Sequence, residues 1–245
     1  MAKPVLILQL RPEDETADSE YRAFLRYGGL RPDQTERLRI EHTGIPQSLD
    51  PGAYSAIIVG GSPFDLSLPE TLKSPMQLRI EADFQRLLDQ VIANDIPFLG
   101  ACSGNGLLGR QLGATISTRH AEPVGCVRLR LTEAGRRDPL LAGFPDQIDV
   151  LLGHKEACDE LPPGAELLLT GSACPVQMFR VGRNVYATQF HPEGDAAGFL
   201  LRIRVYRHHG YFRPEEAEVL SRALKGVRTP HAQQILKRFV ARYCA

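Results

Sequence analysis

The chain has 245 residues, with 29 Lys and Arg against 29 Asp and Glu, so its formal net charge is zero. Hydrophobic residues make up 43% of the chain and charged residues 24%, which is typical of a packed globular protein. The balanced charge argues against a general nucleic-acid binder, which needs an excess of Lys and Arg. The longest uncharged apolar windows, 51–64 and 96–109, are too short for a membrane span, and the N-terminus has no signal-peptide pattern.

The five cysteines are odd in number and scattered along the chain. No CxxC or CxxH pair is present, so the sequence predicts neither a disulfide framework nor a metal site. We therefore expect free thiols, a cytoplasmic protein, and no metal or cofactor.

Apolar runs and helical patterns alternate in the first half of the chain. The predicted strands are Val5–Leu10, Glu36–Glu41, Tyr54–Val59 and Phe98–Gly100, and the predicted helices are Glu20–Tyr27 and Gln77–Ala93. This alternation is typical of an α/β fold with a parallel sheet and right-handed crossovers.

The character of the chain changes after residue 113. Further strands are predicted at Val124–Thr132, Ile148–Leu152, Val176–Val181 and Asn184–Gln189. From Pro214 the pattern predicts two helices separated by Gly226 and Pro230. Because no linker or repeat interrupts the chain, residues 1–245 are expected to form one domain with a helical extension from about residue 196.

A candidate nucleophile, Cys102, lies between a predicted strand and a helix that ends near Leu112. A nucleophile at such a sharp turn needs small residues two positions before and after it, and Gly100 and Gly104 occupy those positions. The helix N-terminus is expected to lower the pKa of the thiol toward neutrality. The alternative is that Cys102 is a small buried hydrophobic residue.

A second segment, Gln189 to Glu193, directly follows a predicted strand. A cysteine nucleophile needs an imidazole to share its proton, and the imidazole needs a carboxylate to fix its tautomer. His191 and Glu193 can supply both groups from one loop. The alternative is an ordinary surface loop.

Together these motifs resemble the class I glutamine amidotransferases, whose pattern is G-x-C-x-G-x-Q followed later by H-P-E. The segment Ile57 to Pro63 is similar to the family's Gly-Gly loop, and Gly153-His154-Lys155 is similar to the stand-alone branch related to GMP synthase. The resemblance implies an open, mostly parallel, flavodoxin-like sheet flanked by helices. It also implies Cys102 as nucleophile, His191 as general base and acid, and Glu193 as its orienting partner.

Further roles follow from the same resemblance. The loop residues Gly60 and Gly61, together with the backbone N–H of Ser103, are expected to face the developing oxyanion. His154 is expected to shape the site, and the alternative is an ordinary loop histidine. Where the family has Gln four residues after the cysteine, this chain has Gly106. The loss of that hydrogen-bonding partner of substrate, typically about 1–3 kcal/mol, suggests a larger or different γ-glutamyl substrate.

The leading hypothesis is a thiol hydrolase that cleaves the γ-amide of glutamine or of a related γ-glutamyl compound through a γ-glutamyl thioester. Such an enzyme either passes ammonia to a separate synthase partner or acts alone. A γ-glutamyl peptidase with the same triad is the second hypothesis. The third is a catalytically idle amidotransferase-like binding or regulatory protein. In each case the expected ligand is a small molecule, not nucleic acid or membrane.

Overall fold

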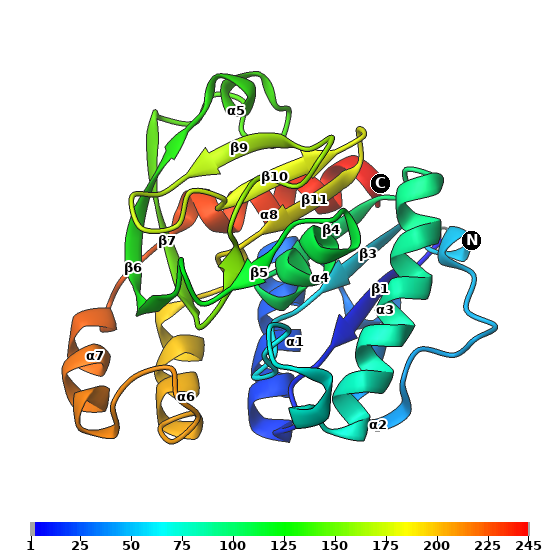
Figure 1. Cartoon of the computed structure of the whole chain (residues 1–245). Helices are drawn as coiled ribbons and strands as arrows, with labels where there is room; N and C mark the ends of the chain where they lie inside the picture. Colours follow the sequence, from blue (N-terminus) through cyan, green and yellow to red (C-terminus); the bar gives the residue numbers. More distant parts are fainter. Residues whose placement is uncertain (1–2, 245) are drawn as a thin grey trace.

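The computed structural model describes residues 3–244, which form a nine-stranded sheet and a two-stranded sheet with flanking helices (Figure 1). The strands are β1 (Val5–Gln9), β2 (Thr35–Arg39), β3 (Ala56–Val59), β4 (Phe98–Ala101), β5 (Ile116–Ser117), β6 (Glu122–Leu131), β7 (Gln147–His154), β8 (Ala157–Cys158), β9 (Glu166–Thr170), β10 (Met178–Val181) and β11 (Val185–Thr188). The α-helices are α1 (Asp14–Gly28), α2 (Ile40–Thr43), α3 (Pro75–Ala93), α4 (Ser103–Gln111), α5 (Glu133–Arg137), α6 (Ala196–Val205), α7 (Ala217–Leu224) and α8 (Pro230–Tyr243). Short 3-10 turns lie at Pro32–Gln34, Pro51–Ala53, Glu70–Leu72 and Pro214–Glu216.

The large sheet has the order β2-β1-β3-β4-β11-β10-β9-β6-β7. Strands β2, β1, β3, β4 and β11 pair in parallel, and the remaining pairs are antiparallel. The predicted fold class, an open α/β sheet flanked by helices, is confirmed. The parallel strands end at a common edge, where functional groups of such sheets gather.

Helices cover both faces of the parallel part of the sheet, because its strands are apolar on both sides. Val5 and Ile7 of β1 belong to one core cluster, together with residues of α1 and α8. Leu6 and Leu8 belong to the other, together with residues of α3 and α4. In Figure 1, α3 and α4 lie in front of the sheet and α8 behind it. The site therefore rests on a core that is packed from both sides.

The structure also differs from several predicted elements. Helix α1 begins six residues before the predicted start at Glu20, and β2 ends at Arg39 because the helical turn α2 follows directly. The prediction omitted α5, the short strands β5 and β8, and strand β9, whose apolar run is only three leucines long. Helix α6 begins at Ala196, where the predicted helical extension starts. No helix within residues 3–244 combines the length and apolar character needed to cross a membrane.

Candidate active site at the carboxyl edge of the sheet

Cys102 occupies a sharp turn between β4 and α4. Its backbone has φ 54° and ψ −97°, one of two positive φ values at non-glycine residues in the described chain. The turn is held by the Cys102 N–H, which donates to the carbonyl of Thr188 at 2.7 Å, and by the Cys102 carbonyl, which accepts from Asn105 N–H at 2.9 Å. A non-glycine residue persists in this backbone region only where its surroundings enforce it, and such positions cluster at functional sites.

Two glycines make this turn sterically feasible. A Cβ atom on Gly100 would lie 2.7 Å from the carbonyl carbon of Gly104, and one on Gly104 would lie 3.3 Å from Val59. The first contact is with backbone and has no room to relax. The predicted role of the two glycines in relieving crowding around Cys102 agrees with these contacts.

The thiol of Cys102 is neutral in the ligand-free protein. Burial raises its pKa to about 11, and the positive charges of Arg11 and Arg202 lower it without offsetting that effect. The expectation that the helix N-terminus brings this pKa toward neutrality is therefore wrong for the ligand-free state, because the loss of water around the sulfur has the larger effect. For Cys102 to act as a nucleophile, a base must remove the proton of its thiol.

His191 lies beyond the end of β11 and is buried. Its N–H bonds to the carbonyl of Leu151 at 3.0 Å, which ties the loop to β7. The ring Nδ1 lies 2.6 Å from Oε1 of Glu193, and the ring packs edge-on against Phe199 at 5.5 Å between centroids. Glu193 in turn accepts a hydrogen bond from Nη2 of Arg202 at 2.9 Å. The imidazole is thus fixed by one carboxylate and one aromatic ring.

These contacts set the charges of the pair. Burial lowers the pKa of His191 below its usual 6.5, outweighing the attraction of Glu193. Burial alone would raise the pKa of Glu193, but the His191 ring and the Arg202 guanidinium hold it well below its usual range. Near neutral pH the carboxylate is charged and the imidazole is neutral. With Nδ1–H donated to Glu193, Nε2 is free to accept a proton.

Cys102 and His191 line the same cavity of about 30 Å³. The hydrogen bonds among residues 3–244 do not include one between the thiol and the imidazole. The other residues that line the cavity are Arg11, Ser62, Val124, Gly153, Phe199, Arg202, Tyr206, Tyr211 and Phe212. A second cavity of about 20 Å³ also includes Cys102 in its lining. The two share Ser62 and Tyr211, whose hydroxyl donates to the Ser62 carbonyl at 2.9 Å.

Two arginines and a glutamate beside the His191–Glu193 pair were not predicted from the sequence. Glu20 of α1 is buried and accepts from Nε of Arg11 at 2.7 Å, and from Gln9 Nε2 at 3.0 Å. Arg202 of α6 lies 3.6 Å from Glu20 and also binds Glu193. Arg11 follows β1 by two residues, so its place at the carboxyl end of a parallel strand was a usable signal. Nothing in the sequence pairs it with Glu20 or Arg202.

The residues expected to bind the oxyanion differ in whether their backbone N–H groups already have an acceptor. The N–H of Gly61 donates to Glu20 Oε1 at 3.2 Å, and a side chain on Gly60 would overlap the same carboxylate. Ser103 is the first residue of α4, so its N–H has no acceptor within the helix. Its hydroxyl accepts from the N–H of Ser62 at 2.8 Å. Ser103 therefore has the available donor in this state, whereas the Gly61 N–H is engaged.

Gly106 and His154 line the second cavity. Gly106 lies in α4 with the Leu66 side chain against it. His154 is the last residue of β7 and is buried, so it is not a residue of an exposed loop.

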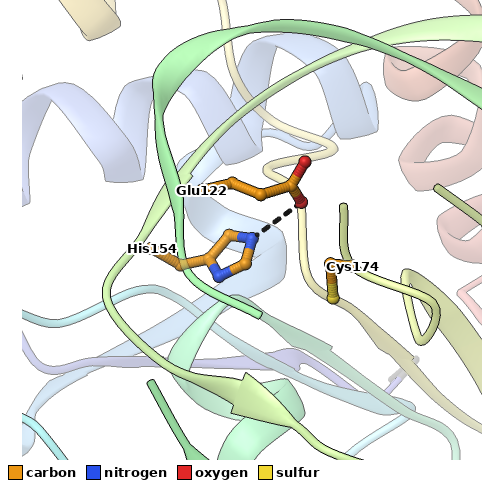
Figure 2. Close-up of side chains that lie close together, drawn as sticks. All are labelled: Glu122, His154 and Cys174. Atoms are coloured by element: carbon orange, nitrogen blue, oxygen red, sulfur yellow. Dashed lines mark hydrogen bonds and ion pairs between the residues drawn. The ribbon is translucent and has the colours of Figure 1, made fainter. Parts of the chain in front are cut away.

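Glu122, His154 and Cys174 place three potential metal ligands within 4.8 Å of one another (Figure 2). His154 Nε2 contacts Glu122 at 3.1 Å, a carboxylate that also accepts from Gln177 Nε2 at 2.5 Å. Burial raises the pKa of the Cys174 thiol to about 12, and its sulfur donates to the Val176 carbonyl at 3.7 Å. The Glu122 carboxylate contacts the His154 ring and accepts from Gln177, and the Cys174 thiol donates to the Val176 carbonyl, so the described contacts form a hydrogen-bonded cluster.

The other group that meets the same distance criterion is Glu20, His191 and Glu193. Its carboxylates are already bound by the guanidinium groups of Arg11 and Arg202. A cation placed there would face two positive charges, so this group also fits a charge network rather than a metal site.

Comparison with known proteins identifies the family and the fold of the chain. Residues 37–198 match the family model of the class I glutamine amidotransferases. The glutamine amidotransferase-like protein YfeJ of Salmonella typhimurium is 30% identical over 155 residues, which cover 60% of this chain and 61% of that protein. A glutamine-hydrolyzing GMP synthase subunit of Methanobrevibacter smithii is 31% identical over 100 residues, covering 40% of this chain and 51% of the relative. The matches thus span between half and two thirds of these relatives.

Solved structures show the same fold over nearly the whole chain. A glutamine amidotransferase from Thermotoga maritima superposes with a TM-score of 0.75 at 21% identity, covering 98% of both chains. A glutamine amidotransferase from Methylobacillus flagellatus gives a TM-score of 0.71 at 18% identity, covering 98% of this chain and 95% of the other.

Proposed function

The chain belongs to the class I glutamine amidotransferases, and from this premise we propose that it is a thiol hydrolase acting on the γ-amide of glutamine or of a related γ-glutamyl compound. Cys102 is the nucleophile, His191 the general base and acid, and Glu193 the residue that orients the imidazole. The observation that carries the proposal is the shared cavity, in which a strained cysteine meets an imidazole already fixed by a carboxylate.

In the first half of the reaction, Nε2 of His191 takes the proton of the Cys102 thiol as the sulfur attacks the γ-carbonyl carbon. The carbonyl oxygen becomes an oxyanion, which the N–H of Ser103 stabilises at the N-terminus of α4. The C–N bond then breaks, and the leaving amine takes the proton from His191. The product of this half is a γ-glutamyl thioester on Cys102.

In the second half, His191 removes a proton from water while the water oxygen attacks the thioester carbon. The C–S bond breaks, glutamate leaves, and the sulfur recovers its proton from His191. Glu193 keeps Nδ1–H in place in both halves and stabilises the imidazolium that forms in each. Gly61 joins Ser103 as an oxyanion donor only if substrate displaces the bond from its N–H to Glu20.

A turnover experiment tests this proposal. The protein is incubated with glutamine and with γ-glutamyl dipeptides, and ammonia, free amino acid and glutamate are measured. We expect glutamate release that is lost in Cys102→Ser and retained in Cys126→Ser, since Cys126 is an exposed thiol in β6. Equal turnover by the two variants, or none by the native protein with either substrate class, contradicts the proposal. The second result favours the catalytically idle binding protein.

The fate of the ammonia is a further part of the proposal. Relatives of this chain include proteins named as glutamine-hydrolyzing subunits of GMP synthase, so a separate synthase is one acceptor. Turnover of glutamine by the isolated chain supports independent action, whereas turnover that requires a second protein supports a partner. All five cysteines are free, which supports the proposed reducing, cytoplasmic compartment.

A further inference from the structure

In the proposed reaction, the two cavities beside Cys102 would hold different parts of the substrate. His191 lines only the larger cavity, and Gly106 and Gln189 line only the smaller one. The group that protonates the leaving amine must lie on the leaving-group side of the scissile bond. The larger cavity is therefore the leaving-group side, and the smaller cavity receives the γ-glutamyl side.

The leaving-group cavity contains a buried guanidinium that ammonia would not use. Arg11 is 3% exposed. Its Nε donates to Glu20 at 2.7 Å and its Nη1 to the hydroxyl of Tyr206 at 3.2 Å. Nη2 has no hydrogen-bond partner within residues 3–244 and is not among the fully enclosed unpartnered atoms, so it is free to donate into the cavity. A carboxylate is the acceptor that a guanidinium fits best.

This free donor lies beside the imidazole. Nη2 of Arg11 is 2.6 Å, and Cε1 of His191 is 2.8 Å, from the same point, where a Cβ atom on residue 61 would sit. The Arg202 guanidinium also lines the cavity, and its Nη1 atom is buried and has no hydrogen-bond partner within residues 3–244. In an α-amino acid, one carbon separates the amine from the carboxylate. An amine near His191 would thus bring its carboxylate to Arg11.

The rest of the cavity wall is mainly apolar. It consists of Val124, Phe199, Tyr206, Tyr211 and Phe212. Such a wall fits a hydrocarbon or aromatic side chain. In the smaller cavity, the Leu66 side chain lies against Gly106 and takes up part of the space. The apolar wall beside His191 is therefore the better place for a larger leaving group.

From these contacts we propose that the leaving group is an apolar amino acid whose carboxylate binds Arg11. The preferred substrate is then a γ-glutamyl amide of such an amino acid rather than glutamine. This inference rests on the proposed function. The leaving amine takes its proton from His191, as in the reaction above, and the products are glutamate and the free amino acid.

Tyr211 forms part of the cavity wall, and its hydroxyl donates to the Ser62 carbonyl at 2.9 Å. A leaving group that fills the cavity would therefore contact Tyr211. The segment that carries Tyr211 joins α6 to the 3-10 turn at Pro214–Glu216, outside the regular elements.

The test compares substrates that differ only in the carboxylate. Glutamate release is measured for γ-glutamyl-phenylalanine, for γ-glutamyl-phenethylamide, which lacks the carboxylate, and for glutamine. We expect kcat/KM for the dipeptide to exceed that for the phenethylamide by about tenfold or more, since a site with a buried donor discriminates against the analogue that lacks its acceptor. Glutamine is expected to be the poorest of the three.

The Arg11→Gln variant then tests whether Arg11 causes the preference for the substrate with a carboxylate. Its general effect on the site cancels in the ratio of the two kcat/KM values, which is expected to fall toward one. Arg204→Gln is the matched control, because Arg204 is exposed and pairs with Glu15 at the surface; it should keep the native ratio. A ratio near one in the native protein, or an unchanged ratio in Arg11→Gln, overturns the inference.

A measurement on the native protein covers the case in which Arg11→Gln does not fold. Free phenylalanine should inhibit turnover more strongly than phenethylamine, and equal inhibition overturns the inference. Different results contradict the leaving-group proposal and the proposed function. Turnover of glutamine without preference for the dipeptide contradicts only this inference. Absence of turnover with every substrate contradicts the proposed function as well.

Discussion

Leu66 lies directly against Gly106: its Cδ1 atom is 3.0 Å from the point where a Cβ atom on residue 106 would sit. The loop that carries Leu66 is tied down on both sides. The Leu66 N–H donates to Glu156 at 2.5 Å, and its carbonyl accepts from Lys73 Nζ at 2.9 Å. The glycine in helix α4 and the leucine in the loop are therefore matched in volume, and the Gln typical of the family does not fit here unless Leu66 moves.

Gly106→Gln is expected to lower the free energy of unfolding by about 1 kcal/mol, because overpacking outweighs the gain in helix propensity. Leu66→Ala removes the obstacle. The double variant should be more stable than the sum of the two single effects predicts, by about 1 kcal/mol or more. Urea unfolding of the four proteins measures this coupling. Strict additivity would show that the two positions do not compete for space.

Glu20→Ala is expected to destabilise the protein by about 3–5 kcal/mol. The substitution leaves the buried charge of Arg11 without its carboxylate and removes the acceptor of the Gly61 N–H. Glu15→Ala is the control in the same helix, since the Glu15 carboxylate is 60% exposed and its pair with Arg204 lies at the surface; it should cost less than about 1 kcal/mol. Similar unfolding free energies for the two variants would contradict the structural role of Glu20.

Glu193→Gln is expected to lower kcat by about 10²–10⁴-fold, the usual contribution of an oriented acid–base group. The amide NH₂ can donate to Nδ1 and so favour the tautomer in which Nε2 carries the proton and cannot accept one. Steady-state kinetics at saturating substrate measures the loss, with Glu15→Gln as the surface control. A kcat within a few-fold of the native value would mean that Glu193 does not orient His191.

The pH dependence follows from the two shifted pKa values. The acidic limb of kcat/KM should have its midpoint below 6.5, because burial lowers the pKa of His191. Below pH 6.5 the unfolded chain takes up a proton at His191 before the folded protein does, so stability falls with pH. The stabilising ionisation of Glu193 is present above 4.5 and is lost as pH falls through its lower folded-state pKa.

Activity measured from pH 4 to 8 and unfolding free energy measured from pH 2 to 8 test both parts of this prediction. An acidic limb centred above 6.5 would show that His191 is charged near neutrality. It would point to a preformed thiolate–imidazolium pair instead of a neutral pair.

The sequence predicted the parts of the site that local patterns encode. Cys102 lies between two glycines at a strand–helix boundary, and His191 and Glu193 are two residues apart in one loop, so each segment can be recognised by itself. The strands beneath them are continuous apolar runs, which is the pattern of a parallel sheet covered on both faces. That the whole chain forms one domain stays a prediction, which the contacts of α8 with α1 and β7 support.

The parts that the sequence did not predict depend on long-range contacts or on solvation. Arg11 and Arg202 meet Glu20 only after α1 and α6 pack together. The Cys102 pKa follows from how fully the surrounding chain removes water, which no local pattern encodes. Tyr211 lies in an irregular segment whose sequence gives no indication that it reaches Ser62.

The central claim is that Cys102 reacts as a nucleophile within reach of His191. The most direct test is incubation with a diazo-ketone analogue of glutamine, followed by intact-mass measurement and peptide mapping. We predict one covalent adduct on the peptide that contains Cys102, absent in Cys102→Ser and present in Cys126→Ser. An adduct on another cysteine, or no adduct while the protein is folded, would contradict the enzymatic account.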